Sequence, residues 1–222
     1  MSRRDNAAQR CGRCRMHESL CVCSLMPRFT TRTRLCLIIH RFEDRKPTNT
    51  GRLAAECLTE SEVIVRGHEG RPVDTFEARP GTVPLLLFPH EGARDLRELS
   101  GLAEPVTLVV PDGSWRQAFK MRQRVQGLES VQCVTLPPGP PSQYRLRFES
   151  HDQGLATVEA IARAFGILEG PHIEEALLGV FGAMVERTLW ARGEIATKDV
   201  RAGIPEGAER HDPKSGLARA RV

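Results

Sequence analysis

Short, largely apolar runs alternate along this chain with segments in which apolar residues recur at helical spacing. Apolar runs bounded by polar residues, Gly or Pro are typical of strands that are buried on both faces, and we expect strands at 35–39, 62–66, 83–88, 105–110 and 131–136. The helical spacing predicts helices at 52–58, 93–99, 115–125, 155–168 and 173–192. This alternation predicts an α/β fold with a mostly parallel sheet and helices on both faces.

The pattern changes near both ends of the chain. Residues 1–30 contain few apolar runs and are predicted to form a small module, and residues 31–195 form the main domain. Residues 196–222 are rich in Gly, Pro and charge, which predicts a flexible tail. Within the main domain, the polar stretch 40–50 is expected to be a long loop.

Four of the seven cysteines lie close together near the N-terminus, in the order Cys11-x2-Cys14-x6-Cys21-x-Cys23. Structural zinc takes four ligands in tetrahedral geometry, and closely spaced cysteines supply such ligands in pairs. His17 could replace one cysteine, and the alternative is a group of four unliganded thiols in a mobile leader. The spacing favours a zinc-binding module formed by these four cysteines.

Composition argues against membrane and secreted classes. The longest apolar runs, such as 85–88, are far shorter than the roughly 20 residues that span a bilayer. The N-terminal residues are polar and do not resemble a signal peptide. With seven cysteines and no such signal, we expect reduced thiols, a cytoplasmic protein and no membrane partner.

The net charge of +4 conceals two basic segments. Residues 1–34 contain eight Arg and two acidic residues, and residues 116–147 contain six basic residues and one acidic residue. Phosphate binding explains such segments if both face one cleft, and codon bias explains them if they do not. In the second segment, Arg116, Lys120 and Arg124 share one helical face by i,i+4 spacing, whereas Arg145 and Arg147 follow a proline-rich stretch.

Candidate chemistry lies in the loops that follow strands, because ligands of open parallel sheets bind outside the carboxyl ends of strands. Asp112, after the strand 105–110, could act as a general base or cap the next helix. Ser114 is as suited to a cap as to chemistry, and Trp115 could be a stacking platform for a base or a core anchor. The segment 48–52 offers polar groups, a Gly for close backbone approach and an Arg suited to a carboxylate, or it could simply cap a helix.

Motifs in these loops resemble those of one known family. The common nucleotide and hydrolase signatures are absent. Residues 10–192, however, resemble the DTW-domain family of tRNA-uridine aminocarboxypropyltransferases. The resemblance rests on the cysteine cluster, on Pro-Thr-Asn-Thr-Gly-Arg at 47–52, on Asp-Gly-Ser-Trp at 112–115 and on Leu-Ala-Thr-Val-Glu-Ala at 155–160. Ser114 stands where the family has Thr, and Ala156 stands where it has Ser.

The resemblance implies both a fold and a reaction. The fold would be SPOUT-like, a class that includes knotted chains, with 31–195 as the catalytic domain. The reaction would transfer the 3-amino-3-carboxypropyl group of S-adenosylmethionine to N3 of a uridine in tRNA and release 5'-methylthioadenosine. Two alternatives are an RNA methyltransferase that uses the same cofactor and a non-catalytic, zinc-containing RNA-binding protein. The partner is tRNA, and no protein partner is inferred.

The resemblance and the loop chemistry together define the predicted sites. The catalytic residues would be Asp112, Ser114 and Trp115. The residues that bind S-adenosylmethionine would be Asn49, Thr50, Gly51, Arg52, Leu87, Phe88, Val109 and Thr157, with Arg52 on the amino acid carboxylate. The RNA-binding residues would be Arg116, Lys120, Arg124, Arg145 and Arg147. The zinc ligands would be Cys11, Cys14, Cys21 and Cys23.

Overall fold

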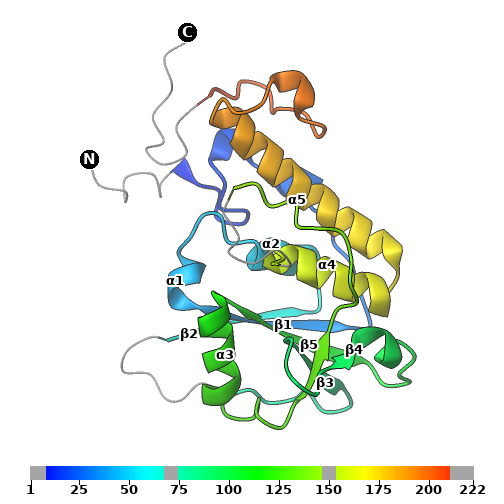
Figure 1. Cartoon of the computed structure of the whole chain (residues 1–222). Helices are drawn as coiled ribbons and strands as arrows, with labels where there is room; N and C mark the ends of the chain where they lie inside the picture. The colour runs from blue at the N-terminus through cyan, green and yellow to red at the C-terminus, as the bar shows by residue number, and fades with distance from the viewer. Residues whose placement is uncertain (1–8, 68–74, 147–153, 211–222) are drawn as a thin grey trace.

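A computed structural model describes residues 9–67, 75–146 and 154–210 of the chain. Its centre is a parallel sheet with the strand order β2-β1-β5-β3-β6-β4 (Figure 1). The strands are β1 (Arg34–His40), β2 (Ser61–Arg66), β3 (Val83–Leu87), β4 (Arg94–Asp95), β5 (Val106–Asp112) and β6 (Gln132–Thr135). Every strand pair of this sheet is parallel, which confirms the predicted sheet type.

Helices cover both faces of the sheet, as predicted. The helices are α1 (Arg41–Asp44), α2 (Gly51–Cys57), α3 (Trp115–Arg124), α4 (Thr157–Leu168) and α5 (Pro171–Ala191). In Figure 1, α2, α4 and α5 lie on one side of the sheet and α3 lies on the other. In the described part of the chain, no helix is both long and apolar enough to cross a membrane. The SPOUT-like knot stays a prediction.

The alternation of side chains between the two faces of the sheet along β5 determines where its last residue, Asp112, points. Leu108 and Val110 pack into the large core with α2, α4 and α5, whereas Val109 packs into the smaller core beneath α3. Successive side chains of a strand point to opposite faces. Asp112, two residues after Val110, is therefore on the face covered by α2 and α4.

The break between α4 and α5 is set by two adjacent residues. Gly170 has a φ of 125°, a backbone conformation that favours glycine, and it separates the last turn of α4 from Pro171. Proline is well suited to the first turn of a helix because its missing N–H has no intrahelical acceptor there. The two helices then pack together over the sheet and bury Phe165 and Phe181.

Two local predictions are wrong. Residues 93–99 form the short strand β4 and a 3₁₀ turn, Leu96–Leu99, instead of an α-helix. The Asp95 carboxylate accepts a hydrogen bond from the Arg97 N–H at 2.9 Å and caps this turn, so the backbone bends after two extended residues. The predicted loop 40–50 begins with the single-turn helix α1, and the His40 side chain accepts from the Phe42 N–H at its start.

Both terminal segments contact the main domain. In the N-terminal module, Cys14, Met16, Leu20 and Val22 belong to the large core. Residues 196–210, expected to be part of a flexible tail, instead pack on α5: Val200 is buried, and Arg201 pairs with the buried Glu186 of α5 at 2.5 Å. The rest of the predicted tail, 211–222, lies outside the described residues.

Candidate active site

A cleft of about 950 Å³ opens at the carboxyl ends of β3, β5 and β6. It is also lined by residues of the segment 43–50, by the proline-rich segment 137–142 and by the first turn of α4. Ligands of open parallel sheets bind outside this edge. The cleft therefore lies where the strand-end loops predict a site.

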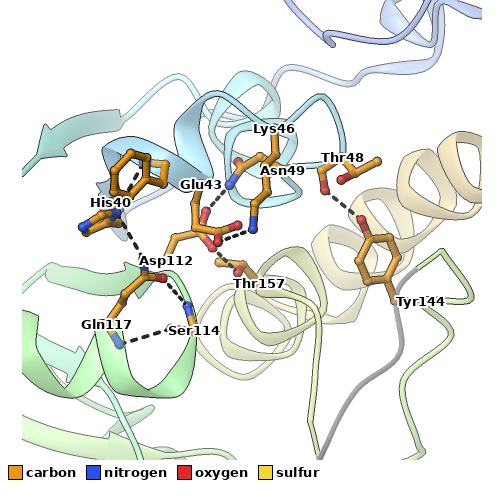
Figure 2. A network of polar contacts seen from close by, with 11 residues as sticks. His40, Glu43, Lys46, Thr48, Asn49, Asp112, Ser114, Gln117, Tyr144 and Thr157 are labelled. Carbon is orange, nitrogen blue, oxygen red and sulfur yellow. Dashed lines mark hydrogen bonds and ion pairs between the residues drawn. The ribbon is translucent and has the colours of Figure 1, made fainter. Parts of the chain in front are cut away.

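Asp112 is a buried carboxylate on the cleft wall, with 6% of its surface exposed. Thr157, the first residue of α4, donates its hydroxyl to Asp112 Oδ1 at 2.6 Å. The Asn49 side-chain amide donates to Asp112 Oδ2 at 2.5 Å (Figure 2). The side-chain oxygen Oδ1 of Asn49 in turn accepts from the Arg52 backbone N–H at 3.1 Å, which connects Asn49 to the first turn of α2. The structure thus brings together three of the predicted residues from three segments that are far apart in the sequence: the loop before α2, the end of β5 and the start of α4.

Gly51 lies directly behind Asp112. A Cβ atom at this position would lie 2.8 Å from Asp112 Oδ2 and 3.1 Å from both methyl groups of Leu37. Carbon–oxygen contacts this short are repulsive, so only glycine lets α2 approach the carboxylate this closely. Gly51 does not line the cleft itself, and its contribution is this close approach.

Ser114 caps α3 and also lines the cleft. Its hydroxyl accepts from the Gln117 N–H at 3.4 Å, and Gln117 Oε1 accepts from the Ser114 N–H at 2.8 Å. The Gln117 amide also lies 3.2 Å from His40 Nδ1, which links α3 to the end of β1 (Figure 2). Burial, together with the nearby Arg66 and Arg41, lowers the pKa of His40, so this imidazole is neutral at physiological pH.

Glu159, in the motif at 155–160, connects the end of the proline-rich segment to the start of α4. The buried Glu159 carboxylate accepts from the Ala156 N–H at 2.8 Å, the Ser142 hydroxyl at 2.6 Å and the Gln143 N–H at 2.7 Å. Thr50 accepts from the Val158 N–H at 3.3 Å, so it also supports the first turn of α4. Glu159 and Thr50 therefore have structural tasks, whereas Thr157 contacts Asp112.

Arg52 faces away from the cleft. It forms an ion pair with Asp44 and does not line the cleft wall, so it is not placed to hold the carboxylate of a bound amino acid. Arg15, from the N-terminal module, donates to the same Asp44 carboxylate at 3.3 Å. Several residues outside the predicted site also line the cleft, and Glu43 and Lys46 are two of them. Their only signal in the sequence was the polar character of the stretch 40–50.

The predicted apolar residues divide between the cleft and the core. Leu87 and Phe88 line the cleft, whereas Val109 is fully buried in the smaller core on the other face of the sheet. Its neighbour Val110 lines the cleft in its place, because alternate residues of β5 point to opposite faces.

Trp115 lies at the rim of the cleft with 46% of its surface exposed, which rules out the core-anchor alternative. Its ring centroid is 6.4 Å from that of Phe88, and Phe119, 45% exposed, is 6.5 Å from Phe88. The two exposed rings are one helical turn apart and form an aromatic stripe along α3.

The predicted basic residues lie mainly along α3. Arg116 lines the cleft, Arg124 is exposed farther along the helix and Lys120 is half-buried between them. Arg145 is exposed after the proline-rich segment, and Arg147 lies outside the described residues.

Arginines of the N-terminal basic segment are used in internal contacts. Arg13 pairs with Glu56 at 3.0 Å, and Arg34 pairs with Glu62 at 2.5 Å. Arg15 is engaged with Asp44, as described above. Among the described residues, no arginine of the N-terminal segment lines the cleft, whereas Arg116 of α3 does.

The four N-terminal cysteines converge, with all four Sγ atoms within 4.8 Å of one another. Cys11 Sγ lies 3.4 Å from Cys23 Sγ, and Cys14 Sγ lies 3.6 Å from Cys21 Sγ. Tetrahedral zinc with bonds of about 2.3 Å needs sulfurs about 3.8 Å apart, so this group fits the ion. His17 instead contacts Ser19 and caps the turn Glu18–Leu20, so it is not the fourth ligand.

The Cys11 thiol ionises more readily than an ordinary cysteine. Burial raises its pKa, but hydrogen bonds from the backbone N–H groups of Cys14 and Arg13 and from the thiols of Cys23 and Cys21 together lower the pKa to about 7. Such N–H donors favour a thiolate, the form that binds metal.

The fold and the site define a class: an α/β protein with a parallel sheet, a cleft at the carboxyl ends of its strands and an N-terminal four-cysteine module. The sequence model of the DTW domain matches residues 8–189, and the chain belongs to this family.

Relatives within the family carry a named activity. The chain is 31% identical over 179 residues to tRNA-uridine aminocarboxypropyltransferase 2 of Macaca fascicularis and 30% identical over 177 residues to that of Mus musculus. Each alignment covers 76% of this chain and 59% of the relative, so the chain spans about three fifths of the length of these proteins. The protein of the same name from Drosophila melanogaster is 24% identical over 181 residues, which cover 78% of this chain and 72% of the relative.

One solved structure is similar to the chain. It is the SAM-dependent rRNA:acp-transferase Tsr3 from Vulcanisaeta distributa, with a TM-score of 0.47 and 16% identity. The similarity covers 72% of this chain and 79% of that one.

Proposed function

We propose that this protein transfers the 3-amino-3-carboxypropyl group of S-adenosylmethionine to N3 of a uridine in tRNA. The observation that carries the proposal is the buried Asp112 carboxylate, which Asn49 and Thr157 hold at the wall of the cleft. These residues belong to three of the four motifs that carry the resemblance, and the family and its named relatives point to the same reaction.

In this mechanism Asp112 is the general base. Uridine N3 carries a proton at neutral pH and becomes a good nucleophile only when that proton is removed. Hydrogen bonds from Asn49 and Thr157 fix the orientation of the carboxylate, so one of its oxygens can be held within reach of the N3 proton. Asp112 later returns the proton to water.

The transfer step forms one bond and breaks another. Uridine N3 attacks the methylene carbon that joins the aminocarboxypropyl group to sulfur, and the carbon–sulfur bond breaks. The bonding pair goes to sulfur, which turns the cationic sulfonium into the neutral thioether of 5'-methylthioadenosine. All three carbons on the sulfonium are electrophilic, so the cleft selects the product by presenting only one of them to the base.

The acceptor tRNA would lie along α3. Trp115 and Phe119 present exposed rings on which unpaired bases can stack. Arg116, at the cleft, and Arg124, farther along the same helix, supply positive charge for the phosphate backbone. The N-terminal module would contribute stability to the main domain, because Arg13 and Arg15 pair with Glu56 and Asp44 of that domain.

Zinc is the ion that we propose for the four-cysteine cluster. When bound, it would be held by Cys11, Cys14, Cys21 and Cys23 and would have a structural task, because four thiolates leave no open position for a substrate. The module supplies Leu20 and Val22 to the large core, so loss of the ion would weaken the main domain as well.

Isotope labelling tests the proposed reaction. The protein is incubated with tRNA and with S-adenosylmethionine that is labelled either in the carboxyl group or in the methyl group. We expect carboxyl label in the RNA and none from the methyl group, with loss of the signal in Asp112→Asn. Methyl label in the RNA would replace the proposal with methyl transfer, and the absence of both labels would overturn it.

A further inference from the structure

Glu43 and Lys46 form an ion pair on the cleft wall that has no role in proton removal by Asp112. Lys46 Nζ lies 2.5 Å from Glu43 Oε1 (Figure 2). The Glu43 side chain is only 10% exposed, whereas the Lys46 side chain is 47% exposed, and both residues line the cleft with Asp112. Burying a carboxylate costs free energy unless the charge is paired, and here the partner is a lysine that also lines the cleft.

The backbone of the segment aims these side chains at the cleft. The Lys46 N–H donates to the Glu43 carbonyl at 2.9 Å, and the Asn49 N–H donates to the Lys46 carbonyl at 3.0 Å. Glu43, Lys46 and Asn49 are three residues apart in the sequence, and these two consecutive turns bring all three to the cleft wall. Asn49 is the residue that holds Asp112, so one segment carries both the ion pair and a support of the base.

A second set of contacts holds this segment from behind. Asp44, next to Glu43 in the chain, pairs with Arg52 of α2 and with Arg15 of the N-terminal module. Neither arginine lines the cleft. Arg52 therefore positions the segment, and Lys46 is the cation of this segment that lines the cleft.

The chemistry of the pair matches one part of the donor molecule. The aminocarboxypropyl group of S-adenosylmethionine carries an ammonium and a carboxylate on the same carbon, and an ion pair of opposite polarity is complementary to it. In such an arrangement the ligand ammonium would contact Glu43 and the ligand carboxylate would contact Lys46. The four charges then alternate and sum to zero, so the buried Glu43 stays neutralised when the ligand is bound.

We propose that Glu43 and Lys46 bind the amino and carboxylate groups of the aminocarboxypropyl moiety of S-adenosylmethionine. This inference rests on the proposed function and adds the residues that grip the transferred group. Because Asn49 connects the same segment to Asp112, the position of Glu43 and Lys46 is fixed relative to that of the base. The segment would thereby present the correct sulfonium carbon to the acceptor.

Three ligands that differ only in this group test the proposal by calorimetric titration. S-Adenosylmethionine has both charged groups, its decarboxylated form lacks the carboxylate, and 5'-methylthioadenosine lacks both. We expect Lys46→Met to weaken S-adenosylmethionine binding by roughly 10- to 100-fold, and to leave both other ligands unchanged. We expect Glu43→Gln to weaken S-adenosylmethionine and its decarboxylated form, and to leave 5'-methylthioadenosine unchanged.

Matched controls separate this effect from a general loss of structure. Glu56→Gln changes a residue of α2 that pairs with Arg13 of the N-terminal module. Lys198→Met removes an exposed lysine that follows α5 in the chain. Neither Glu56 nor Lys198 lines the cleft. Both variants should bind all three ligands as the unmodified protein does. The circular-dichroism melting temperature reports whether each variant is folded.

The outcomes distinguish the two proposals. If the unmodified protein binds neither S-adenosylmethionine nor 5'-methylthioadenosine, the proposed function fails and this inference fails with it. If the unmodified protein binds all three ligands but the Glu43 and Lys46 variants weaken them equally, or weaken none, only the grip on the aminocarboxypropyl group is overturned.

Discussion

Substitution of Gly51 by Ala adds a single methyl group behind the carboxylate of Asp112. The new Cβ would lie 2.8 Å from Asp112 Oδ2, and ordinary contact begins near 3.4 Å, so one of the two must move by about 0.6 Å. Asn49 and Thr157 hold the carboxylate, and Leu37 blocks the methyl group on another side at 3.1 Å. The displacement will therefore be shared between α2 and Asp112.

The effect on activity should exceed the effect on stability. Active sites tolerate displacements of about 0.5 Å, and a misplacement of about 1 Å can cost about 100-fold in rate. We therefore expect kcat to decrease by roughly 10- to 100-fold. Overpacking costs about 1–3 kcal/mol, whereas replacing glycine in a helix recovers about 1 kcal/mol, so the free energy of unfolding should decrease by no more than about 2 kcal/mol.

The assay compares Gly51→Ala with Gly179→Ala under the same conditions. Gly179 lies within α5, and a Cβ there would meet nothing within 4 Å. Gly179→Ala should gain about 0.5–1 kcal/mol in urea unfolding and keep full aminocarboxypropyl transfer. Full activity of Gly51→Ala at an unchanged melting temperature would refute the idea that the close approach of α2 sets the position of Asp112.

Four further outcomes are expected. Asp112→Asn should lower the transfer rate by about 100- to 10,000-fold while the melting temperature stays close to that of the unmodified protein; a comparable rate would exclude the base assignment. Glu159→Gln should lower the free energy of unfolding by about 2–3 kcal/mol in urea titrations, because one buried acceptor of three hydrogen bonds is replaced by a group that is partly a donor; an unchanged urea midpoint would contradict this. The pKa of His40 is lower in the folded protein, so the unfolded chain binds a proton at a higher pH than the folded protein does. The stability that neutral His40 contributes is therefore present above about pH 6.5 and is lost as the pH falls below that value. His40→Asn keeps a helix cap and should make the free energy of unfolding less dependent on pH between about 7.5 and about 5.5. Cys11→Ser should lower both the zinc content by atomic absorption and the melting temperature, and a metal-free protein of unchanged stability would argue against the zinc module.

Periodicity in the sequence was sufficient for most of the fold. The strands around Ile38, Leu86 and Val109 were predicted because each is buried on both faces and therefore apolar throughout. The helix expected at 93–99 failed because seven residues are too few for periodicity to distinguish an α-helix from a strand followed by a 3₁₀ turn.

Some residues of the candidate site were predicted correctly from the sequence, and others were not. Asp112 and Asn49 were selected because each lies in a loop that follows a strand, and those loops must meet at one edge of a parallel sheet. Thr157 was selected through the resemblance of the segment 155–160 to the family motif. Arg52 was expected to bind a carboxylate because guanidinium groups suit carboxylates. The carboxylate that it binds, however, belongs to Asp44 of the same chain.

The sequence by itself therefore determined the sheet type, the edge at which the cleft opens and the chemistry available there, because these follow from local periodicity and from the order of the strands. Only the tertiary structure decided which charged groups face the cleft and which pair with each other. Arg15, Asp44 and Arg52 are distant in sequence or on different elements, and their pairing turns Arg52 away and leaves Lys46 beside Glu43 at the cleft. Such partner choices depend on the three-dimensional approach of side chains, and no local pattern records them.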